Sequence, residues 1–187
     1  MILYYLSLLA FFYSQAQHKP PVSFTEEYIE FRLKKDIFTV NGIYVFVNNT
    51  NGYSTEEIHY PFPATGFSID SVHVFDMNHG KYLETERRQK DVVFRLNVPP
   101  KDTLKLNIFY RQKGVKDTAT YILTTTKNWG EPLRKGEYTF TTDASRKIRS
   151  FSYPPDKKNL MEKEQKYFWS RKDFLPEKDF IVVFEKK

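Results

Sequence analysis

Residues 38–47 read FTVNGIYVFV, a stretch rich in the aromatic and β-branched side chains that favour a β-strand. Its second half is apolar at nearly every position, which suits a central strand of a sheet. The sequence Asn48-Asn49-Thr50-Asn51-Gly52 follows at once and is typical of a turn. The stretch therefore predicts a buried strand that ends near residue 47.

The same signal recurs on both sides of this strand. Upstream, Ile29, Phe31 and Leu33 alternate with polar residues, so they share one face of a strand. Downstream, residues 58–60 lead into Pro61-Phe62-Pro63, where two prolines must end pairing. Further strands are expected at residues 67–75, 82–87, 118–126, 137–141 and 148–153.

Apolar and polar side chains alternate in residues 92–98 and again in 104–110, and a short break at Pro99-Pro100 separates the two segments. We therefore expect them to pair as a hairpin. The charged stretch 156–166 leaves two interpretations open, a short helix or a hairpin whose return strand is 166–169.

The last strand is expected at residues 179–185, which read DFIVVFE. Both of its faces are apolar, which predicts a strand that lies between two neighbours. Pro176 should end any pairing of Phe174 before this strand begins.

Together these segments predict an all-β chain of about ten strands at a spacing of 8–15 residues, with no helical periodicity between them. This spacing favours an antiparallel β-sandwich, and a closed barrel is the alternative. No shift in composition divides residues 17–187, so we expect a single β-sandwich domain there.

The N-terminal residues 1–16 are predicted to be a signal peptide. Residues 2–13 are almost wholly apolar, and Ser14-Gln15-Ala16 places small residues where a signal peptidase reads them. The apolar run is shorter than the ~20 residues that a spanning helix needs, so we expect no transmembrane span after cleavage. The mature chain should begin at Gln17 and be secreted, periplasmic or associated with the cell envelope; an uncleaved tether is the alternative. The chain has no Cys, so its fold uses no disulfide.

The net charge of +6 is unevenly distributed. Residues 18–80 carry a net −4, residues 81–116 a net +6 and residues 117–187 a net +4. The basic window includes Arg87, Arg88 and Arg111, which are candidates for binding an anionic polysaccharide or an acidic envelope protein. The alternative is that these residues are solvated strand ends, where charge discourages edge-to-edge pairing. Nucleic acid is not expected as a partner, because the chain is exported and has no recognition motif.

Two tryptophans are candidate platforms for a ligand. Trp129 lies in a loop-like stretch at residues 127–133, and Trp169 follows Tyr167-Phe168. Indole faces stack on sugar rings, so either residue could bind a carbohydrate. The alternative is that both rings close the ends of the core, where an aromatic side chain buries ~150–250 Å².

The candidate metal ligands are His73, Asp76 and His79. In a strand His73 and His79 would share a face while Asp76 points away. Residues 76–80 also have the composition of a hairpin turn, so we expect no metal site and no cofactor.

No motif for nucleophilic catalysis is present. The chain lacks Cys and has no Gly-x-Ser-x-Gly elbow. The carboxylate pairs Glu26-Glu27 and Glu56-Glu57 are sequence neighbours, so in strands their members face opposite ways. We therefore expect no catalytic residues and no enzyme.

Several short blocks resemble those of uncharacterised exported bacterial proteins with a predicted immunoglobulin-like β-sandwich. The resemblance covers most of the mature chain and implies that fold and export, but it assigns no functional residue. The blocks are Thr124-Thr125-Thr126, Trp129-Gly130 with Pro132-Leu133, Phe151-Ser152-Tyr153-Pro154, Phe174 with Pro176, and Asp179-Phe180.

The sequence thus predicts an exported, non-enzymatic binding or interaction module whose ligand is open. The alternative is a carbohydrate-binding module that uses Trp129 and neighbouring aromatic residues, and a hydrolase built on the sandwich is third. Exposed aromatic residues along one sheet face would favour sugar binding. A cleft that joins a His to a carboxylate would favour an enzyme.

Overall fold

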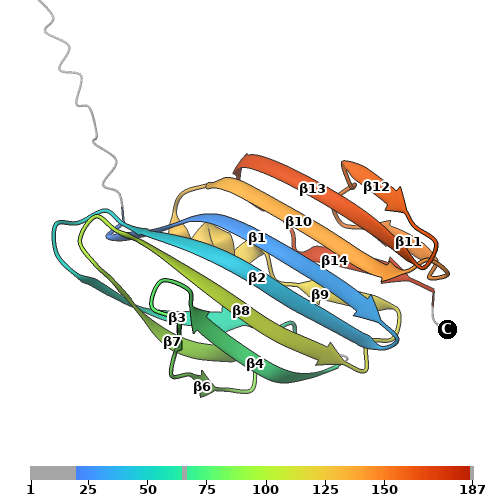
Figure 1. Ribbon diagram of the computed structural model, residues 1–187, viewed down its shortest axis with the longest axis horizontal. Coiled ribbons are helices and arrows are strands. Elements are labelled where there is room, and N and C mark those ends of the chain that lie inside the picture. The colour runs from blue at the N-terminus through green and yellow to red at the C-terminus, as the bar shows by residue number, and fades with distance from the viewer. Residues whose placement is uncertain (1–19, 65–66, 186–187) are drawn as a thin grey trace, which may run out of the picture.

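The computed structural model describes residues 20–64 and 67–185, so the predicted signal peptide lies outside the described residues. Fourteen strands and one short 3-10 helix, η1 (Thr124–Trp129), make up the elements of the described chain (Figure 1). The all-β prediction is therefore confirmed.

The largest layer is an eight-stranded sheet with long strands at its centre (Figure 1). β1 and β2 lie in the middle, and β8 follows on one side and β10 on the other. From edge to edge the strands are β12 (Lys157–Leu160), β13 (Glu164–Phe174), β10 (Leu133–Asp143), β1 (Val22–Lys34), β2 (Ile37–Asn48), β8 (Thr103–Lys113), β4 (Ser68–Asp76) and β5 (Lys81–Tyr82).

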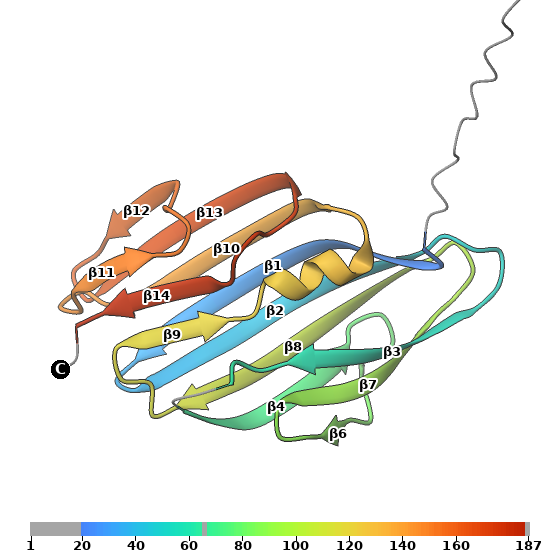
Figure 2. The ribbon, with the colours of Figure 1, turned by 180° about the vertical axis from the view of Figure 1, so that it is seen from behind.

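Two three-stranded sheets lie against one face of this layer, as Figure 2 shows. One of them covers the β8–β4 side and the other covers the β1–β10–β13 side, with η1 beside β9. The first consists of β3 (Ser54–Pro61), β7 (Asp91–Val98) and β6 (Glu86–Arg87), and the second of β11 (Ile148–Phe151), β14 (Phe180–Phe184) and β9 (Thr118–Tyr121).

The core fills the space between these layers. Ile29, Phe31 and Leu33 of β1 are each 1% exposed, so the alternation read from the sequence is confirmed. The ring of Phe31 stacks on that of Phe180 in β14, with centroids 4.5 Å apart. On the other side of the core, the rings of Tyr60 in β3 and Tyr110 in β8 are 6.0 Å apart. These rings belong to the buried apolar core, whose removal from water stabilises the fold.

Several expected elements are confirmed. Residues 38–47 form most of β2, which pairs with β1 and β8 and is central. Residues 156–166 belong to a hairpin, because β12 pairs antiparallel with β13. The last strand, β14, lies between β11 and β9, and β13 ends at Phe174.

The strand count and pairing differ from the expectation in two ways. The described chain has fourteen strands rather than about ten, because several two- to four-residue strands extend the sheet edges. The sheet is not wholly antiparallel, since β1 and β10 pair in parallel. A constant immunoglobulin domain divides seven strands between two sheets. The eight-stranded layer alone has more strands than that whole domain, and the immunoglobulin-like strand order stays a prediction.

The expected hairpin between residues 92–98 and 104–110 is wrong. β7 pairs with β3 and β6, whereas β8 pairs with β2 and β4. The Pro99-Pro100 link therefore carries the chain from one layer to the other. Asn48 anchors this crossing, because its amide nitrogen donates to the carbonyl oxygens of Gly52, Val98 and Pro99.

Only the first part of residues 118–126 is a strand. The carboxylate of Asp179 accepts hydrogen bonds from the backbone N–H groups of Leu123 and Thr124 and from the Thr124 hydroxyl, at 2.8–3.1 Å. These bonds satisfy donors at the start of η1, and Gly130, with φ 74°, ends it. The β-branched run therefore turns into a short helix where β14 begins.

Candidate functional site

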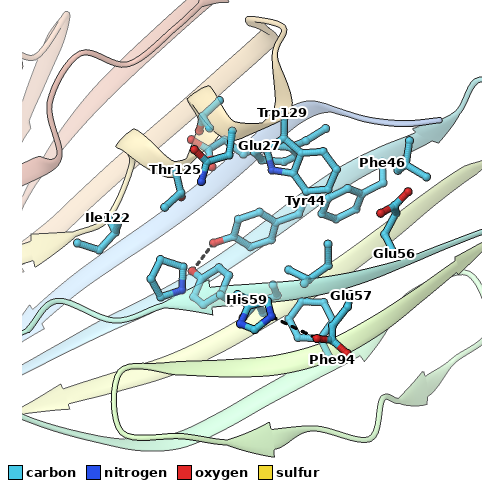
Figure 3. A pocket seen from close by; sticks show the side chains of 18 of the residues that line it. Glu27, Tyr44, Phe46, Glu56, Glu57, His59, Phe94, Ile122, Thr125 and Trp129 are labelled. Atoms are coloured by element: carbon cyan, nitrogen blue, oxygen red, sulfur yellow. Dashed lines mark hydrogen bonds and ion pairs between the residues drawn. The ribbon is translucent and has the colours of Figure 1, made fainter. Parts of the chain in front are cut away.

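A pocket of about 420 Å³ lies between the inner face of the eight-stranded sheet and strand β3 (Figure 3). Strands β1 and β2 contribute Phe24, Tyr44 and Phe46, and the segment from β9 through η1 contributes Trp129. In Figure 3, Glu27 and Trp129 lie on one side of the pocket and Glu57 and His59 on the opposite side. The volume is within the range of small-molecule sites.

Glu27 is the buried acidic group of this pocket and is 1% exposed. On β1 it lies in register between Tyr44 of β2 and Gly136 of β10. Its carboxylate accepts hydrogen bonds from the hydroxyls of Tyr138 at 2.5 Å and Tyr121 at 3.1 Å. A buried charge-bearing group is thus held by two donors.

The tyrosine hydroxyls form a chain that leads from the other wall to Glu27. Tyr121 donates to Glu27, so the 3.0 Å bond between Tyr121 and Tyr44 must be donated by Tyr44. The 2.7 Å bond between Tyr44 and Tyr60 must then be donated by Tyr60. Each hydroxyl has one proton, so all the donors point toward Glu27.

Two glycines allow this arrangement. A Cβ at Gly42 would lie 2.6 Å from Cε2 of Tyr44, and a Cβ at Gly136 would lie 2.7 Å from the Tyr138 hydroxyl oxygen. Each tyrosine therefore leans back over the glycine two residues before it. Any other side chain at these positions would displace a ring that belongs to the network.

The environment shifts the ionisation of these groups. Burial raises the pKa of Glu27 from the ordinary 4.5 to about 7, and the hydrogen bonds from Tyr138 and Tyr121 oppose that rise. Burial also raises the pKa of Tyr44 and Tyr121 well above 10.0. The phenols therefore remain hydrogen-bond donors while Glu27 can change its charge near neutral pH.

Trp129 forms an aromatic wall of the pocket. Its ring centroid lies 5.9 Å from that of Phe24 and 5.3 Å from that of Phe46. The residue is partly buried and ends η1, which Asp179 holds at its other end. The loop expected around Trp129 is thus a helix end that places the indole in the pocket.

The mouth of the pocket carries Glu56, Glu57 and His59 of β3. The imidazole of His59 is hydrogen-bonded to Glu57 at 3.3 Å through Nε2 and to Asp91 at 3.2 Å through Nδ1. Arg95 lies 3.7 Å from the other oxygen of Glu57. Both ring nitrogens of His59 are therefore occupied by carboxylates.

The structure places the second tryptophan in the core. Trp169 is 3% exposed, and its indole N–H donates to the carbonyl oxygen of Tyr153 at 3.0 Å. Its ring packs edge-on against Phe180 at 5.0 Å. Trp169 thus closes the core and presents no free face to a ligand.

Each of the three candidate arginines has a local partner: Arg87 lies on β6, Arg88 follows that strand, and Arg111 lies on β8 in another sheet. The Arg87 guanidinium lies 4.2 Å from the ring centroid of Phe62, and Arg88 pairs with Glu86 at 2.7 Å. Arg111 of β8 pairs with Asp70 at 2.9 Å. The structure does not bring these three residues together as one site.

The turn interpretation of residues 76–80 is confirmed. One oxygen of Asp76 accepts the backbone N–H groups of Asn78 and His79, and the other is 2.8 Å from Nδ1 of His79. The turn joins β4 to β5, and His73 stacks instead against Phe109. Over residues 20–64 and 67–185, no three His, Asp or Glu side chains converge in a way that could hold a metal ion.

A second, shallower hollow of about 320 Å³ lies on the outer face of the large sheet. The rings of Phe75 and Tyr82 meet there at 5.1 Å, and Asn107 donates to the side chain of Asn41 at 2.8 Å. Tyr82 is 70% exposed. The residues that line this hollow are Asn41, His73, Phe75, Tyr82, Asn107 and Phe109.

Sequence reasoning missed Glu27, although a signal for it was present. Glu27 is in phase with Ile29, Phe31 and Leu33, so the alternation already placed it on the buried face. A Glu on a core-facing position is rare unless it is partnered. Its partners, Tyr121 and Tyr138, lie on distant strands and could not be assigned from sequence spacing.

Among the residues that the structure describes, no helix has the length and apolar character needed to cross a membrane.

No protein-family model matches the chain, and no curated protein matches it. The fold is nevertheless shared with solved structures. A "putative nutrient binding protein" from Legionella pneumophila matches 89% of this chain and 68% of its own, at 15% identity and a TM-score of 0.72.

An M1 zinc metallopeptidase from Deinococcus radiodurans matches 87% of this chain at 9% identity and a TM-score of 0.53. A variant of it with a bound tripeptide substrate matches at 8% identity and a TM-score of 0.54. The match covers 42% of either peptidase chain, so the present chain corresponds to less than half of their length. At these identities the likeness shows the fold alone.

Proposed function

We propose that the chain is an exported, non-enzymatic binding module whose small-molecule ligand occupies the pocket between β3 and the large sheet. The observation that carries this proposal is a preformed cavity of about 420 Å³ with aromatic walls and a buried carboxyl–tyrosine network. Ligand sites typically combine apolar walls with a few fixed polar groups. The name of the Legionella protein is in line with a binding role.

The export part of the proposal rests on the predicted signal peptide, residues 1–16. It would place the module in the periplasm, on the cell envelope or outside the cell. Envelope proteins and anionic polysaccharides are proposed partners through the basic segment 81–116, separately from the pocket.

A binding role fits the groups in the pocket better than catalysis does. Glu27 and the tyrosine hydroxyls are already hydrogen-bonded to one another. His59, the candidate base at the mouth, has both ring nitrogens occupied by Glu57 and Asp91. A general base needs a free lone pair aimed at its substrate, and the His59 imidazole has none, so we assign the pocket a binding role.

The test is to purify the protein without denaturation, identify co-purifying small molecules by native mass spectrometry, and screen metabolites by thermal shift. We expect a ligand that stabilises the parent protein and is lost from Thr125→Trp, whose larger side chain would fill the pocket from η1. The matched control is Tyr53→Ala, since Tyr53 is 71% exposed and lies outside the pocket. Undiminished binding by folded Thr125→Trp would contradict the proposal.

The outer-face hollow supports a second candidate, carbohydrate binding. The exposed ring of Tyr82 lies there beside the half-buried rings of Phe75 and Phe109 and two amide side chains, an arrangement that suits stacking on sugars. Trp129, the other candidate for stacking, lies in the pocket. Affinity electrophoresis against soluble polysaccharides tests it. We expect retardation by one of them that Tyr82→Ala abolishes and Tyr53→Ala preserves; equal migration of the parent and Tyr82→Ala would rule it out.

A further inference from the structure

The charges around the pocket are unlike those of the chain as a whole. Glu27, Glu56 and Glu57 line it, and no Lys or Arg is among the described residues that do so. The chain as a whole carries +6. The other titratable groups in the described part of the lining are the His59 imidazole and the tyrosine phenols. The pocket is therefore an acidic site within a basic protein.

Within the carboxyl–tyrosine network, acceptor positions remain free, but every hydroxyl proton is already used. Every proton in the chain from Tyr60 through Tyr44 and Tyr121 is directed toward Glu27. Glu27 accepts two hydrogen bonds, one of them from Tyr138, whereas an ionised carboxylate has about four acceptor positions. A group that donates hydrogen bonds would complete this network, and a group that only accepts them would find no donor within it.

The walls favour the same class of ligand. Trp129 packs with Phe24 and Phe46, and Phe24 also stacks at 5.9 Å on Tyr44, a member of the carboxyl–tyrosine network. The faces of aromatic rings attract cations, and the attraction is strongest where the site excludes water. The same rings give an apolar ligand body a surface to pack against.

Resting on the pocket-binding function proposed above, we propose that the ligand is an organic amine: a primary ammonium group on an aromatic or apolar body. The ammonium donates to Glu27, and the body packs between Trp129 and strand β3. The carboxylates Glu56 and Glu57 at the mouth attract such a cation from solution. Among the described lining residues, an anionic ligand would meet three carboxylates and no Lys or Arg side chain.

This assignment gives binding a distinctive pH dependence. From the elements packed against it, Glu27 faces Tyr44 of β2, Tyr121 of β9 and Tyr138 of β10, all of which stay protonated. Because the pKa of Glu27 is about 7, its ionised fraction rises from roughly one tenth at pH 6 to nine tenths at pH 8. An alkylammonium, with a pKa of about 10, stays charged over this range. Binding should therefore strengthen about tenfold between pH 6 and pH 8.

The experiment compares three probes of similar shape by isothermal titration calorimetry: tryptamine, its neutral analogue tryptophol and the anion indole-3-propionate. We expect tryptamine to bind at least about tenfold more tightly than tryptophol at pH 8, a difference typical of one charge-assisted hydrogen bond. Indole-3-propionate should not bind. Glu27→Gln should weaken tryptamine at least about tenfold and abolish its pH dependence, whereas Glu30→Gln, on the exposed face of β1, should leave both unchanged.

Three results would overturn the proposal. If tryptophol binds as tightly as tryptamine, the pocket binds ligands without regard to charge, and the pocket-binding function stands while the amine assignment falls. An affinity for tryptamine that is flat from pH 6 to pH 8 in the parent protein would contradict a role for Glu27, and this measurement needs no variant. If none of the probes binds, the amine assignment also fails, and the co-purification experiment with Thr125→Trp decides separately whether the pocket binds anything.

Discussion

Replacement of Glu27 by Gln should change how the free energy of unfolding depends on pH. The folded chain holds the Glu27 proton with a pKa of about 7, whereas the unfolded chain holds it with the ordinary value of 4.5. A raised pKa stabilises the fold below pH 4.5, and this contribution is lost as pH rises toward 7. The loss of stability is about 3 kcal/mol in total, because each unit of difference between the folded and unfolded pKa corresponds to about 1.4 kcal/mol. Most of this loss falls between pH 5 and pH 8.

The assay is urea unfolding of the parent, Glu27→Gln and Glu30→Gln at pH 5 and pH 8. An amide cannot ionise, so the parent should lose about 2–3 kcal/mol relative to Glu27→Gln between these pH values, equivalent to a midpoint shift of about 1 M urea. Glu30→Gln removes an exposed carboxyl from the same strand and should follow the parent. A parent and a Glu27→Gln variant with the same pH dependence would refute the reasoning that burial controls this carboxyl.

Three further outcomes are expected. Gly136→Ala should lower the free energy of unfolding, measured in urea, by about 1–3 kcal/mol, because the new Cβ would lie 2.7 Å from the Tyr138 hydroxyl oxygen. Gly52→Ala is the control and should change little, because open space surrounds Gly52. Equal effects of the two substitutions would contradict a steric role for Gly136. A chain that ends at Lys178 lacks β14 and with it three side chains that are at most 1% exposed, each of which contributes ~1.5–3 kcal/mol through burial. Circular dichroism should therefore show this shortened chain to be unfolded. A cooperative melt would show instead that β14 is dispensable. Asp179→Ala should cost about 1–2 kcal/mol in the same urea assay, because η1 loses the three hydrogen bonds at its start, and an unchanged midpoint would refute that role.

Much of the fold could be predicted because alternation depends only on local sequence. The strand around Ile29 and Phe31, the central strand at residues 38–47 and the buried last strand were all found in this way. Alternation does not say which strands are partners. Residues 92–98 and 104–110 look like a hairpin, yet β7 and β8 lie in different layers because the Pro99-Pro100 link is anchored by Asn48 from another strand.

The candidate site was less accessible to sequence reasoning for the same physical cause. Trp129 was identified as a candidate, but its place in the pocket depends on η1, which Asp179 starts from 55 residues away. Glu27 is hydrogen-bonded to Tyr121 and Tyr138, which are 94 and 111 residues distant. A carboxyl on the apolar face of a strand can be recognised from sequence, but the groups that stabilise it there are set by the tertiary fold.

The most direct test of the binding proposal is a crystal structure of the protein soaked with tryptamine at pH 8. We expect the indole to lie between Trp129 and β3, with the ammonium nitrogen within about 3 Å of the Glu27 carboxylate. Tryptamine bound only at the outer hollow beside Tyr82, or a pocket that stays empty when the ligand saturates the protein in solution, would contradict it.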